Sequence, residues 1–457
     1  MPDDLTLDDL SARTGEAAEE LRRWQSLGLL SARGGEAFRP EDVERVKLIQ
    51  LFVRRGIDLD AIVRAEEQQP FLERRIEMLF PRGVGPTYSL AEAAEMASID
   101  LDVARRFFKA GNLFHDGVGL EQEDVMALRG VKQVLDAGYP EEARLQVIRV
   151  YADTMERAAE AGQRAFHFYV HERMRAAGMS PSEVREAVEA VSQHALALAE
   201  PTVLYFFRKA RVRAQREDFV MHVAEEAGLA GLPDVPGQLS RAIMFVDLSS
   251  FTPLAEAMGD VKAAEVLDQF SLMVRDAAHR WEGQVIKQIG DAFMLVFPDA
   301  RSAVACSLEI EARTAEAPQF PAARSGVHWG RVLYREGDYV GSNVNVAARV
   351  AAEAQRHQTL VTSSVWREAK GLPDVEFVRL GKRRLRGLAR EVDLFEARPM
   401  AAASREKSVD PVCGMELGAD EVAARLTLDG GERTFCSEDC LRQFVAAPER
   451  YPAKAAP

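Results

Sequence analysis

The second half of the chain alternates short apolar runs with segments of helical periodicity, and this order restricts the fold more than any other feature. Residues 242–246 form an apolar run typical of a buried strand, and helical periodicity follows over 253–281. Two further apolar runs flank a Gly-Asp pair at 290–291, which indicates a β-hairpin. A second helix over 299–315, with an aspartate suited to cap its start, precedes a strand over 325–334. The order βαββαβ predicts an α+β sandwich of the ferredoxin-like kind.

Six polar residues gather in three short blocks of this region. They supply two carboxylates suited to divalent cations, a cation and a carboxylate suited to the edge of a base, and an amide and a guanidinium suited to a phosphate: Asp247, Lys287, Asp291, Asp338, Asn345 and Arg349. The last two are four residues apart on an expected helix and therefore project from one face. This inventory predicts chemistry on a nucleoside triphosphate.

Residues 238–398 resemble the catalytic domain of class III nucleotidyl cyclases, because residue type, order and spacing agree in all three blocks. The resemblance implies that Asp247 and Asp291 hold two Mg²⁺ or Mn²⁺ ions in each active site. These cations prefer hard oxygen ligands. It also implies an in-line attack of the ribose 3′-hydroxyl on the α-phosphate, which forms a 3′,5′-cyclic nucleotide and diphosphate.

By the same resemblance, the turn after the first strand binds the triphosphate through its backbone N–H groups, as other strand-to-helix turns do. Its residues are Leu248, Ser249, Ser250, Phe251 and Thr252. Family members often carry glycine where Ser250 stands, and serine fits the turn if its φ stays negative. Arg386 aligns approximately with a basic residue that contacts the terminal phosphate. The basic run at 382–384 leaves that register open, and a solvated basic turn is the alternative.

Lys287 and Asp338 resemble the pair that selects the base. A lysine donates to N1 of adenine and a carboxylate accepts from its N6 amine, whereas guanine presents the opposite groups at both positions. The pair therefore favours ATP over GTP and opposes the alternative of a guanylyl cyclase. The resemblance further implies that Asn345 orients the ribose and that Arg349 stabilises charge on the α-phosphate in the transition state.

The distribution of these residues has a consequence for assembly. In this family the metal-binding aspartates come from one catalytic domain, and the base-binding and transition-state residues come from another. This chain carries both sets in a single domain. The resemblance therefore implies a head-to-tail homodimer with two composite ATP sites.

The first 145 residues contain an internal repeat. Residues 5–13 align with 88–96, and residues 22–24 align with 105–107, at an offset of 83 positions that becomes 82 further along the chain. Each copy predicts two short helices, a loop and a longer helix that ends at a glycine.

The first copy, expected over 1–70, resembles the helix-turn-helix of the MerR family through residues 21–43. This resemblance implies winged-helix-like repeats, the second of them over 86–145. The charge of the copies is acidic, with nine basic against thirteen acidic residues in 1–60 and six against eleven in 88–145. Because phosphate neutralisation dominates DNA affinity, this charge disfavours DNA binding. The alternative is that the paired arginines of each copy lie on helix faces used for protein contacts.

Residues 146–227 are expected to form a helical bundle that joins the repeats to the catalytic domain, with a break at 178–181. His167 and His171 stand at i and i+4, a spacing that can hold a metal ion. The sequence offers no further ligand nearby, so a packing or surface role is the simpler interpretation. A linker with glycine and proline follows at 228–237.

Residues 409–453 resemble the YHS domain, a small metal-associated module, and follow a linker at 400–404. Cys413, Cys436 and Cys440 offer three soft ligands suited to Zn²⁺ or Cu⁺. Fewer than fifty residues make a poor core, which favours a structural metal. Buried reduced cysteines without metal are the alternative. The sequence leaves the fourth ligand open among water, another chain, Asp410, Met415 and Asp439.

The composition of the whole chain excludes several classes of protein. The length of 457 residues indicates several domains, and the net charge of −14 argues against general affinity for nucleic acid or anionic membranes. No apolar run approaches the roughly 18 residues that span a bilayer, and the acidic start at 1–5 does not resemble a signal peptide. These features predict a cytoplasmic protein with no membrane partner. The fourth cysteine, Cys306, is expected in the core of the catalytic domain.

Together these observations predict a multi-domain chain with an all-α N-terminal half, an α+β cyclase domain and a small metal-associated C-terminal module. The expected function is an adenylyl cyclase that makes cyclic AMP and diphosphate from ATP. The N-terminal modules and the YHS module would regulate it through a ligand or protein that the sequence does not identify. The alternative from another class is a DNA-binding transcriptional regulator in which the cyclase domain serves as a dimeriser or a nucleotide sensor.

Overall fold

The computed structural model describes residues 5–30, 37–68, 70–79, 87–113, 119–228, 235–400, 408–418, 421–428 and 431–451. The chain divides into two compact units, Met1–Arg208 and Lys209–Pro457. The expected linkers at 228–237 and 400–404 fall largely outside the described residues. Among the described helices, none is both long and apolar enough to cross a membrane.

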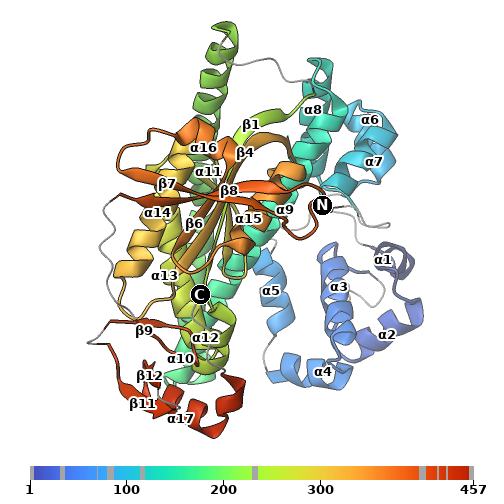
Figure 1. The fold of residues 1–457 in the computed structure, drawn as a ribbon. Helices are drawn as coiled ribbons and strands as arrows, with labels where there is room; N and C mark the ends of the chain where they lie inside the picture. The colour runs from blue at the N-terminus through green and yellow to red at the C-terminus, as the bar shows by residue number, and fades with distance from the viewer. Residues whose placement is uncertain are drawn as a thin grey trace. The chain divides into compact units, whose positions relative to one another are not determined.

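The first unit is helical and repeats one three-helix pattern (Figure 1). The helices of the two copies are α1 (Leu7–Thr14), α2 (Ala18–Ser26) and α3 (Glu41–Arg54), then α6 (Leu90–Ala97), α7 (Leu101–Ala110) and α8 (Gln122–Asp136). The first helix of each copy begins with a capping box. An isolated β-bridge then joins the start of each copy to the segment before its third helix, Leu5 to Phe38 and Tyr88 to Leu120. The bridges lie at equivalent positions, so the structure reproduces the internal repeat.

The winged-helix description of these repeats stays a prediction. The loops in which a wing would lie, 31–36 and 114–118, are outside the described residues. Between the two copies run α4 (Leu59–Gln68) and α5 (Phe71–Leu79), which the repeat pattern did not predict. Part of α4 and α5 packs into the core of the first copy through Ile62 and Leu72.

Long helices follow the repeats, as expected. They are α9 (Glu141–Phe166), a π-helical turn (His167–His171), α10 (Glu172–Ala176) and α11 (Pro181–Glu226), within which the boundary between the two units falls. The expected break before α11 is present, and Ser180 caps the helix: its Oγ accepts from the N–H of Glu183 at 3.4 Å, and its own N–H donates to Glu183 Oε2 at 2.8 Å. The π-helical turn was not predicted, because the i and i+4 spacing of the two histidines does not distinguish an α-helix from a π-helix.

The second unit is built on a mixed sheet with the strand order β2-β3-β1-β4-β6-β8-β7, and β5 pairs with β4. The strands are β1 (Gln238–Leu248), β2 (Gln284–Ile289), β3 (Ala292–Phe297), β4 (Ala323–Arg335), β5 (Asp338–Val340), β6 (Gln358–Thr362), β7 (Val375–Arg383) and β8 (Val392–Pro399). The first four pair antiparallel in the order β2-β3-β1-β4, which is the ferredoxin-like core expected from the sequence. The parallel pairing of β4 with β6 makes the whole sheet mixed.

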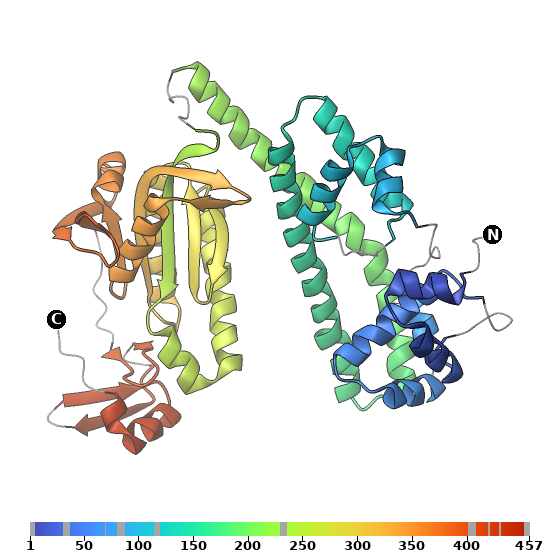
Figure 2. The same cartoon turned by 90° about the vertical axis from the view of Figure 1, so that its right-hand side faces the viewer.

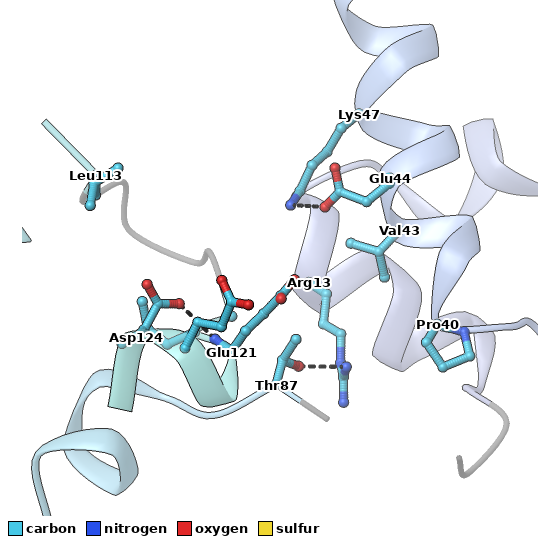
Figure 3. Close-up of a pocket in the computed structure, with 12 residues that line it drawn as sticks. Arg13, Pro40, Val43, Glu44, Lys47, Thr87, Leu113, Glu121 and Asp124 are labelled. Atoms are coloured by element: carbon cyan, nitrogen blue, oxygen red, sulfur yellow. Dashed lines mark hydrogen bonds and ion pairs between the residues drawn. The ribbon is translucent and has the colours of Figure 1, made fainter. Parts of the chain in front are cut away.

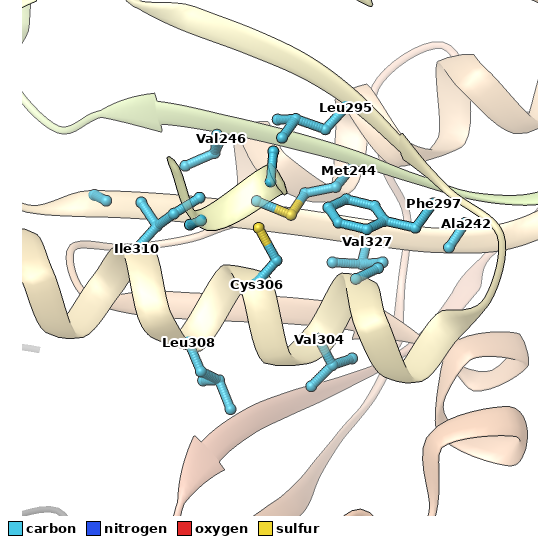
Figure 4. Packing of buried hydrophobic residues seen from close by; sticks show 14 of the residues in the cluster. Ala242, Met244, Val246, Leu295, Phe297, Val304, Cys306, Leu308, Ile310 and Val327 are labelled. Atoms are coloured by element: carbon cyan, nitrogen blue, oxygen red, sulfur yellow. The ribbon is translucent and has the colours of Figure 1, made fainter. Parts of the chain in front are cut away.

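Helices cover both faces of this sheet (Figure 2). On one face, α13 (Asp260–Arg280) and α14 (Ala300–Glu316) pack over the largest hydrophobic cluster. On the other face, α15 (Ser342–Glu353) packs against β1, β3 and β4. Figure 4 shows Cys306 of α14 pointing toward Met244 of β1, and both side chains are fully buried. Burial also raises the pKa of the Cys306 thiol, in keeping with the predicted core position.

The helix expected over 253–281 is two helices in the structure, and this part of the prediction was wrong. The first, α12 (Phe251–Met258), ends at Gly259, and α13 begins at Asp260. Gly259 has φ 80° and ψ 163°, a backbone conformation that only glycine adopts readily. The hydrophobic periodicity of the sequence continues across this glycine, so the break between the two helices could not be predicted from it.

The C-terminal module is small and shares its core with the sheet domain of the second unit. Its elements are β9 (Ser408–Val409), β10 (Glu416–Leu417), β11 (Ala424–Leu428), β12 (Gly431–Phe435), α17 (Glu438–Ala446) and a 3₁₀ turn (Pro448–Arg450). Phe435 and Phe444 of the module belong to one buried cluster with Leu254 of α12 and Ala263 of α13. The poor core expected for such a short segment is therefore completed by α12 and α13.

Close contact between β4 and α15 positions the helix that carries Asn345 and Arg349. A Cβ at Gly326 of β4 would lie 2.0 Å from the backbone nitrogen of Ala351 in α15. At the start of the helix, Asn343 Nδ2 donates to the Arg331 carbonyl at 2.7 Å, and Asn343 Oδ1 lies 3.0 Å from His328 Nε2. Burial lowers the pKa of His328, so the neutral ring is favoured in this position.

We expect Gly326→Ala to destabilise the second unit by about 1–3 kcal/mol, because the added methyl group meets helix backbone that has no room to move. The measurement is the midpoint of urea-induced unfolding. Gly162→Ala in α9 is the matched control, since nothing lies within 4 Å of its added Cβ and alanine favours helix over glycine by about 1 kcal/mol. Equal midpoints for Gly326→Ala and the wild type would contradict the close contact.

Candidate active site and cysteine site

Asp247 lies at the end of β1, directly opposite Arg324 of β4 in the antiparallel register. Arg324 binds both carboxylate oxygens: Nε donates to Oδ1 at 2.5 Å and Nη2 donates to Oδ2 at 3.0 Å. Burial raises the pKa of Asp247, and the hydrogen bond and charge of Arg324 act against this rise. Arg324 was not predicted as a site residue, because no spacing in the chain relates two residues that meet only through strand pairing.

Asp291 lies in the turn between β2 and β3, beside the backbone of Leu248 at the end of β1. Burial raises the pKa of Asp291, and the negative charge of nearby Asp247 raises it further. The two aspartates are therefore half-buried neighbours, and Arg324 is a counter-charge to both. Carboxylates are acceptors only, so a divalent cation fits this pair chemically.

The turn after β1 differs in two respects from the expectation. The N–H of Ser249 donates to the Ala322 carbonyl at 2.7 Å, so it is not free for a phosphate. The other expected groups are those of Leu248, which ends β1, and of Ser250, Phe251 and Thr252 at the start of α12.

The second difference concerns Ser250. Its φ is 65° and its ψ is 30°, so the condition of a negative φ is not met. A side chain other than glycine in this left-handed region costs about 1–2 kcal/mol. A serine thus adopts the backbone conformation that glycine favours, so contacts with neighbouring residues must stabilise this conformation.

Lys287 of β2 and Asp338 of β5 are in contact through Nζ and Oδ2, although 51 positions separate them in the chain. The other oxygen of Asp338 accepts from the N–H of Tyr339 at 2.8 Å. Both side chains are a little over one third exposed. The structure thus brings together a cation and a carboxylate at an accessible position, as the base-selecting interpretation requires.

Asn345 and Arg349 are exposed on α15, whose buried face carries Ala347, Val350 and Ala351. Both polar residues therefore face away from the sheet of their own domain. Arg386 is exposed in the turn after β7, beside Leu385, which is buried together with Val350 in a separate small cluster.

The cysteine site of the C-terminal module is compact. Ligand atoms of Asp410, Cys413, Cys436 and Cys440 all lie within 4.8 Å of one another. The sulfur atoms of Cys413 and Cys436 are 3.5 Å apart, and those of Cys436 and Cys440 are 3.6 Å apart. A tetrahedral zinc ion with Zn–S bonds of about 2.3 Å separates its sulfur ligands by about 3.8 Å, so the donor set fits such an ion.

Of the fourth ligands left open by the sequence, the structure places Asp410 in the group. Asp410 is fully buried, and its carboxylate also accepts from the N–H groups of Val412 at 2.8 Å and Cys436 at 2.7 Å. Asp439 instead is exposed beside Arg442. Hydrogen bonds from the neighbouring thiols hold the pKa of Cys440 well below its usual range, while the contact with Cys436 raises the pKa of Cys413. Cys440 is therefore the thiol of the group that most favours the metal-binding thiolate form.

A second group of metal-ligand type lies in the π-helical turn. The rings of His167 and His171 are stacked with centroids 5.2 Å apart, and Glu172 completes a group of three ligand atoms within 4.8 Å. Sequence analysis did not include Glu172. His167 is exposed, and exposed groups of this kind commonly occur without an ion.

A pocket lies between the two repeat copies of the first unit (Figure 3). Arg13 crosses it and donates from Nη1 to Thr87 Oγ1 at 2.9 Å. Glu44, Glu121 and Asp124 give the lining an acidic character. None of the six polar residues of the catalytic domain lines this pocket, so it is separate from the candidate active site.

Glu311, a half-buried carboxyl group on α14, was not predicted from the sequence. Glu311 of α14 accepts a hydrogen bond from Thr359 Oγ1 at 3.5 Å. Burial raises the pKa of Glu311 to about 7, while His357 and Thr359 act in the opposite direction. The folded state therefore retains a proton on this residue that the unfolded chain releases near its ordinary pKa of 4.5.

We expect the stability of the second unit to fall as the pH rises from about 4.5 to 7, because the folded state binds the Glu311 proton more tightly than the unfolded state does. Glu311→Gln should flatten this dependence and add on the order of 2–3 kcal/mol at pH 8. Urea unfolding at pH 5 and pH 8 measures both effects. Glu316→Gln, on an exposed position of the same helix, is the control. An unchanged pH profile in Glu311→Gln would rule out the effect.

Three regions of the chain match known families. Residues 25–208 match the adenylate cyclase regulatory domain, residues 238–396 match the adenylate and guanylate cyclase catalytic domain, and residues 408–454 match the YHS domain. The solved structure of the adenylyl cyclase CyaB from P. aeruginosa has 18% sequence identity, covers 37% of this chain and 96% of that chain, and has a TM-score of 0.33.

Relatives match over longer stretches. An adenylate cyclase of Streptomyces coelicolor is 27% identical over 288 residues, which cover 62% of this chain and 71% of that protein. A pH-sensitive adenylate cyclase of Mycobacterium tuberculosis is 30% identical over 383 residues, which cover 81% of this chain and 91% of that protein. Because the match to this relative covers most of both chains, this protein belongs to the adenylate cyclase family.

Proposed function

We propose that this adenylate cyclase converts ATP to 3′,5′-cyclic AMP and diphosphate at two composite sites of a homodimer. The observation that carries the proposal is the half-buried pair Asp247 and Asp291 beside the start of α12. In each site this pair would hold two Mg²⁺ or Mn²⁺ ions. Bound there, the ions would supply positive charge to the triphosphate and favour the deprotonated 3′-hydroxyl.

The remaining groups of the site come from the chain itself. The N–H groups at the start of α12 point along the helix axis and bind phosphate oxygens, which the helix dipole favours. Arg349 stabilises the charge that develops on the α-phosphate, and Asn345 orients the ribose for in-line attack. Arg386 contacts the terminal phosphate. In this scheme Arg324 neutralises Asp247 until the cations bind.

Lys287 and Asp338 select adenine. Their mutual contact shows that the two side chains reach one another, and both are accessible enough for a base to enter between them. Lys287 then donates to N1 of adenine, and Asp338 accepts from N6. Guanine would leave both charged groups facing a group of the wrong kind, and such a mismatch discriminates strongly.

Exposure of the catalytic helix supports the dimer. Asn345 and Arg349 face away from their own sheet, so they have no substrate to act on within one domain. Ile289 is 61% exposed beside the Asp291 turn, and Val340 is 42% exposed beside Asp338. A second catalytic domain would cover these apolar side chains and bring its own polar set to the aspartates.

The N-terminal region is proposed as a regulator. The proposed parts of the chain are repeats at 1–70 and 86–145, a bundle at 146–227, the catalytic domain at 238–398 and the YHS module at 409–453. A MerR-like helix-turn-helix remains part of this proposal, in a protein-contact role. The charges support that role, because three of the four paired arginines bind carboxylates: Arg23 to Glu20, Arg105 to Asp102 and Arg106 to Glu141. DNA reading would need these arginines for phosphates.

Complementation tests the composite site. Asp291→Ala and Arg349→Ala should each make no cyclic AMP from ATP in Mn²⁺, because each removes an essential group from both sites of a homodimer. Mixed dimers of the two variants contain one intact site, so co-expression in equal amounts should restore about a quarter of the wild-type activity. Separately tagged chains isolate the mixed dimer. Failure of the isolated mixed dimer to turn over ATP would exclude a site shared between protomers.

The base assignment predicts a change of nucleotide preference. Lys287→Glu with Asp338→Asn presents an acceptor to guanine N1 and a donor to guanine O6, so activity with GTP should appear and activity with ATP should fall by one to two orders of magnitude (about 1–3 kcal/mol). Rates with ATP and GTP, offered separately in Mn²⁺, measure the change. The Mn²⁺ dependence should stay as in the wild type. An unaltered preference for ATP would contradict the assignment of Lys287 and Asp338 as the base-selecting pair.

A further inference from the structure

The loop that carries Cys413 packs directly on the triphosphate-binding turn. A Cβ at Gly414 would lie 2.4 Å from the Cβ of Ser250, so the two backbones meet with only a serine side chain between them. Arg356 joins the same two residues: Nη1 donates to Ser250 Oγ at 3.2 Å, and Nη2 donates to the carbonyl oxygen of Gly414. The contact therefore holds both sides of the turn.

A charged contact fixes the loop on the catalytic domain. Glu416 is 7% exposed and accepts from Arg356 Nε at 3.3 Å. Its other oxygen is bound by His357 Nε2. Removing one partner of a buried pair leaves the others without a counter-charge, which is costly. Glu416 thus ties the C-terminal module to the residues that follow α15.

The module also covers α12 along its length. Leu254 of α12 is fully buried in the same cluster as Phe435 and Phe444. At the far end of the helix, Gln443 Nε2 donates to the Ala257 carbonyl at 3.3 Å. Both ends of the phosphate-binding helix therefore contact the module.

The backbone conformation of Ser250 explains why the turn needs these contacts. A serine at φ 65° is strained, and such a conformation persists only where the surroundings hold it. The same residue opens α12, since its carbonyl accepts from the N–H of Leu254 at 3.2 Å. If Ser250 relaxed to negative φ, the first N–H groups of α12 would lose their alignment toward a phosphate.

The cysteine site is joined to this turn by a short stretch of backbone. Gly414 follows Cys413 directly, and Asp410 organises the loop by accepting from the N–H groups of Val412 and Cys436. A metal ion bound by the three thiolates would restrict the same loop from its other side, because one ligand stands next to the residue that contacts Ser250.

We propose that the C-terminal module supports the triphosphate-binding turn, and that Zn²⁺ or another thiophilic cation in the cysteine site strengthens this support and lowers the KM for ATP. The proposal rests on the proposed adenylate cyclase function. It assigns Ser250, Gly414, Arg356 and Glu416 as positioning residues that act on the nucleotide through the turn.

The first experiment is a double-mutant comparison in the full-length protein. Glu416→Gln should raise the KM for ATP about five- to tenfold with little change in kcat, because the strained turn loses its support. In the Ser250→Gly background the same substitution should change KM less than twofold, since glycine adopts the left-handed conformation without support. Glu432→Gln is the matched control, because Glu432 pairs with Arg425 on the surface of the same module.

The second experiment needs no turnover. Amide hydrogen exchange over residues 250–254 should slow when the reduced protein binds one equivalent of Zn²⁺. Competition with a chelating dye measures how much Zn²⁺ is bound. Cys436→Ser alters the most exposed of the three thiols and should abolish the slowing. Because exchange is read without catalysis, failure of this proposal can be told apart from failure of the proposed function.

Two results would overturn the proposal. One is exchange over 250–254 that is the same with and without bound Zn²⁺. The other is a Glu416→Gln variant whose KM is unchanged, or lowered, in the Ser250 protein; a lowered KM would mean that the module restrains the turn in a conformation unsuited to ATP.

Discussion

The antiparallel pairing of β1 with β4 is the interaction on which the rest of the catalytic domain depends. It runs from Gln238 to Leu248 along the whole of β1 and places Asp247 opposite Arg324. The same register puts Gly326 beneath α15 and brings Ser249 to the carbonyl of Ala322. A shift of one residue would turn every side chain of β1 to the other face. Asp247, the turn at 249–252 and helix α15 would then all lose their positions together.

The polar groups of the candidate site differ in how deeply they are buried. Asp247 and Asp291 are half-buried and share one arginine, while Asn345 and Arg349 lie on a solvent-facing helix. Burial raises the free energy of the carboxylates, which makes them good hosts for cations. Asn345 and Arg349 remain in water, so they carry no desolvation cost, and their side chains are accessible. This difference in burial is consistent with the proposed homodimer, in which the exposed pair of one copy would act at the aspartates of the other.

Much of the candidate site could be predicted from local sequence. The helical spacing of Asn345 and Arg349 and the hairpin around Asp291 depend on residues close together in the chain, and the structure contains both. The group of three cysteines was expected from the similarity to the YHS domain, because Cys413 and Cys436 are 23 positions apart. The prediction failed where local pattern and backbone geometry differ. Gly259 interrupts a helix without interrupting hydrophobic periodicity, and Ser250 takes a left-handed conformation that its side chain disfavours. Neighbouring structure, and not residue preference, decides both.

By itself, the sequence determined which chemical groups this protein possesses, which elements carry them and to which family the catalytic domain and the cysteine module are similar. These properties follow from residue type and short-range spacing. Only the tertiary structure decided which groups meet: Arg324 with Asp247 across 77 positions, Lys287 with Asp338 across 51, and Arg356 with Gly414 across 58. Such contacts arise from strand register and from the burial of surfaces shared between domains. No local pattern encodes them, because the distance between two residues along the chain does not set their distance in space.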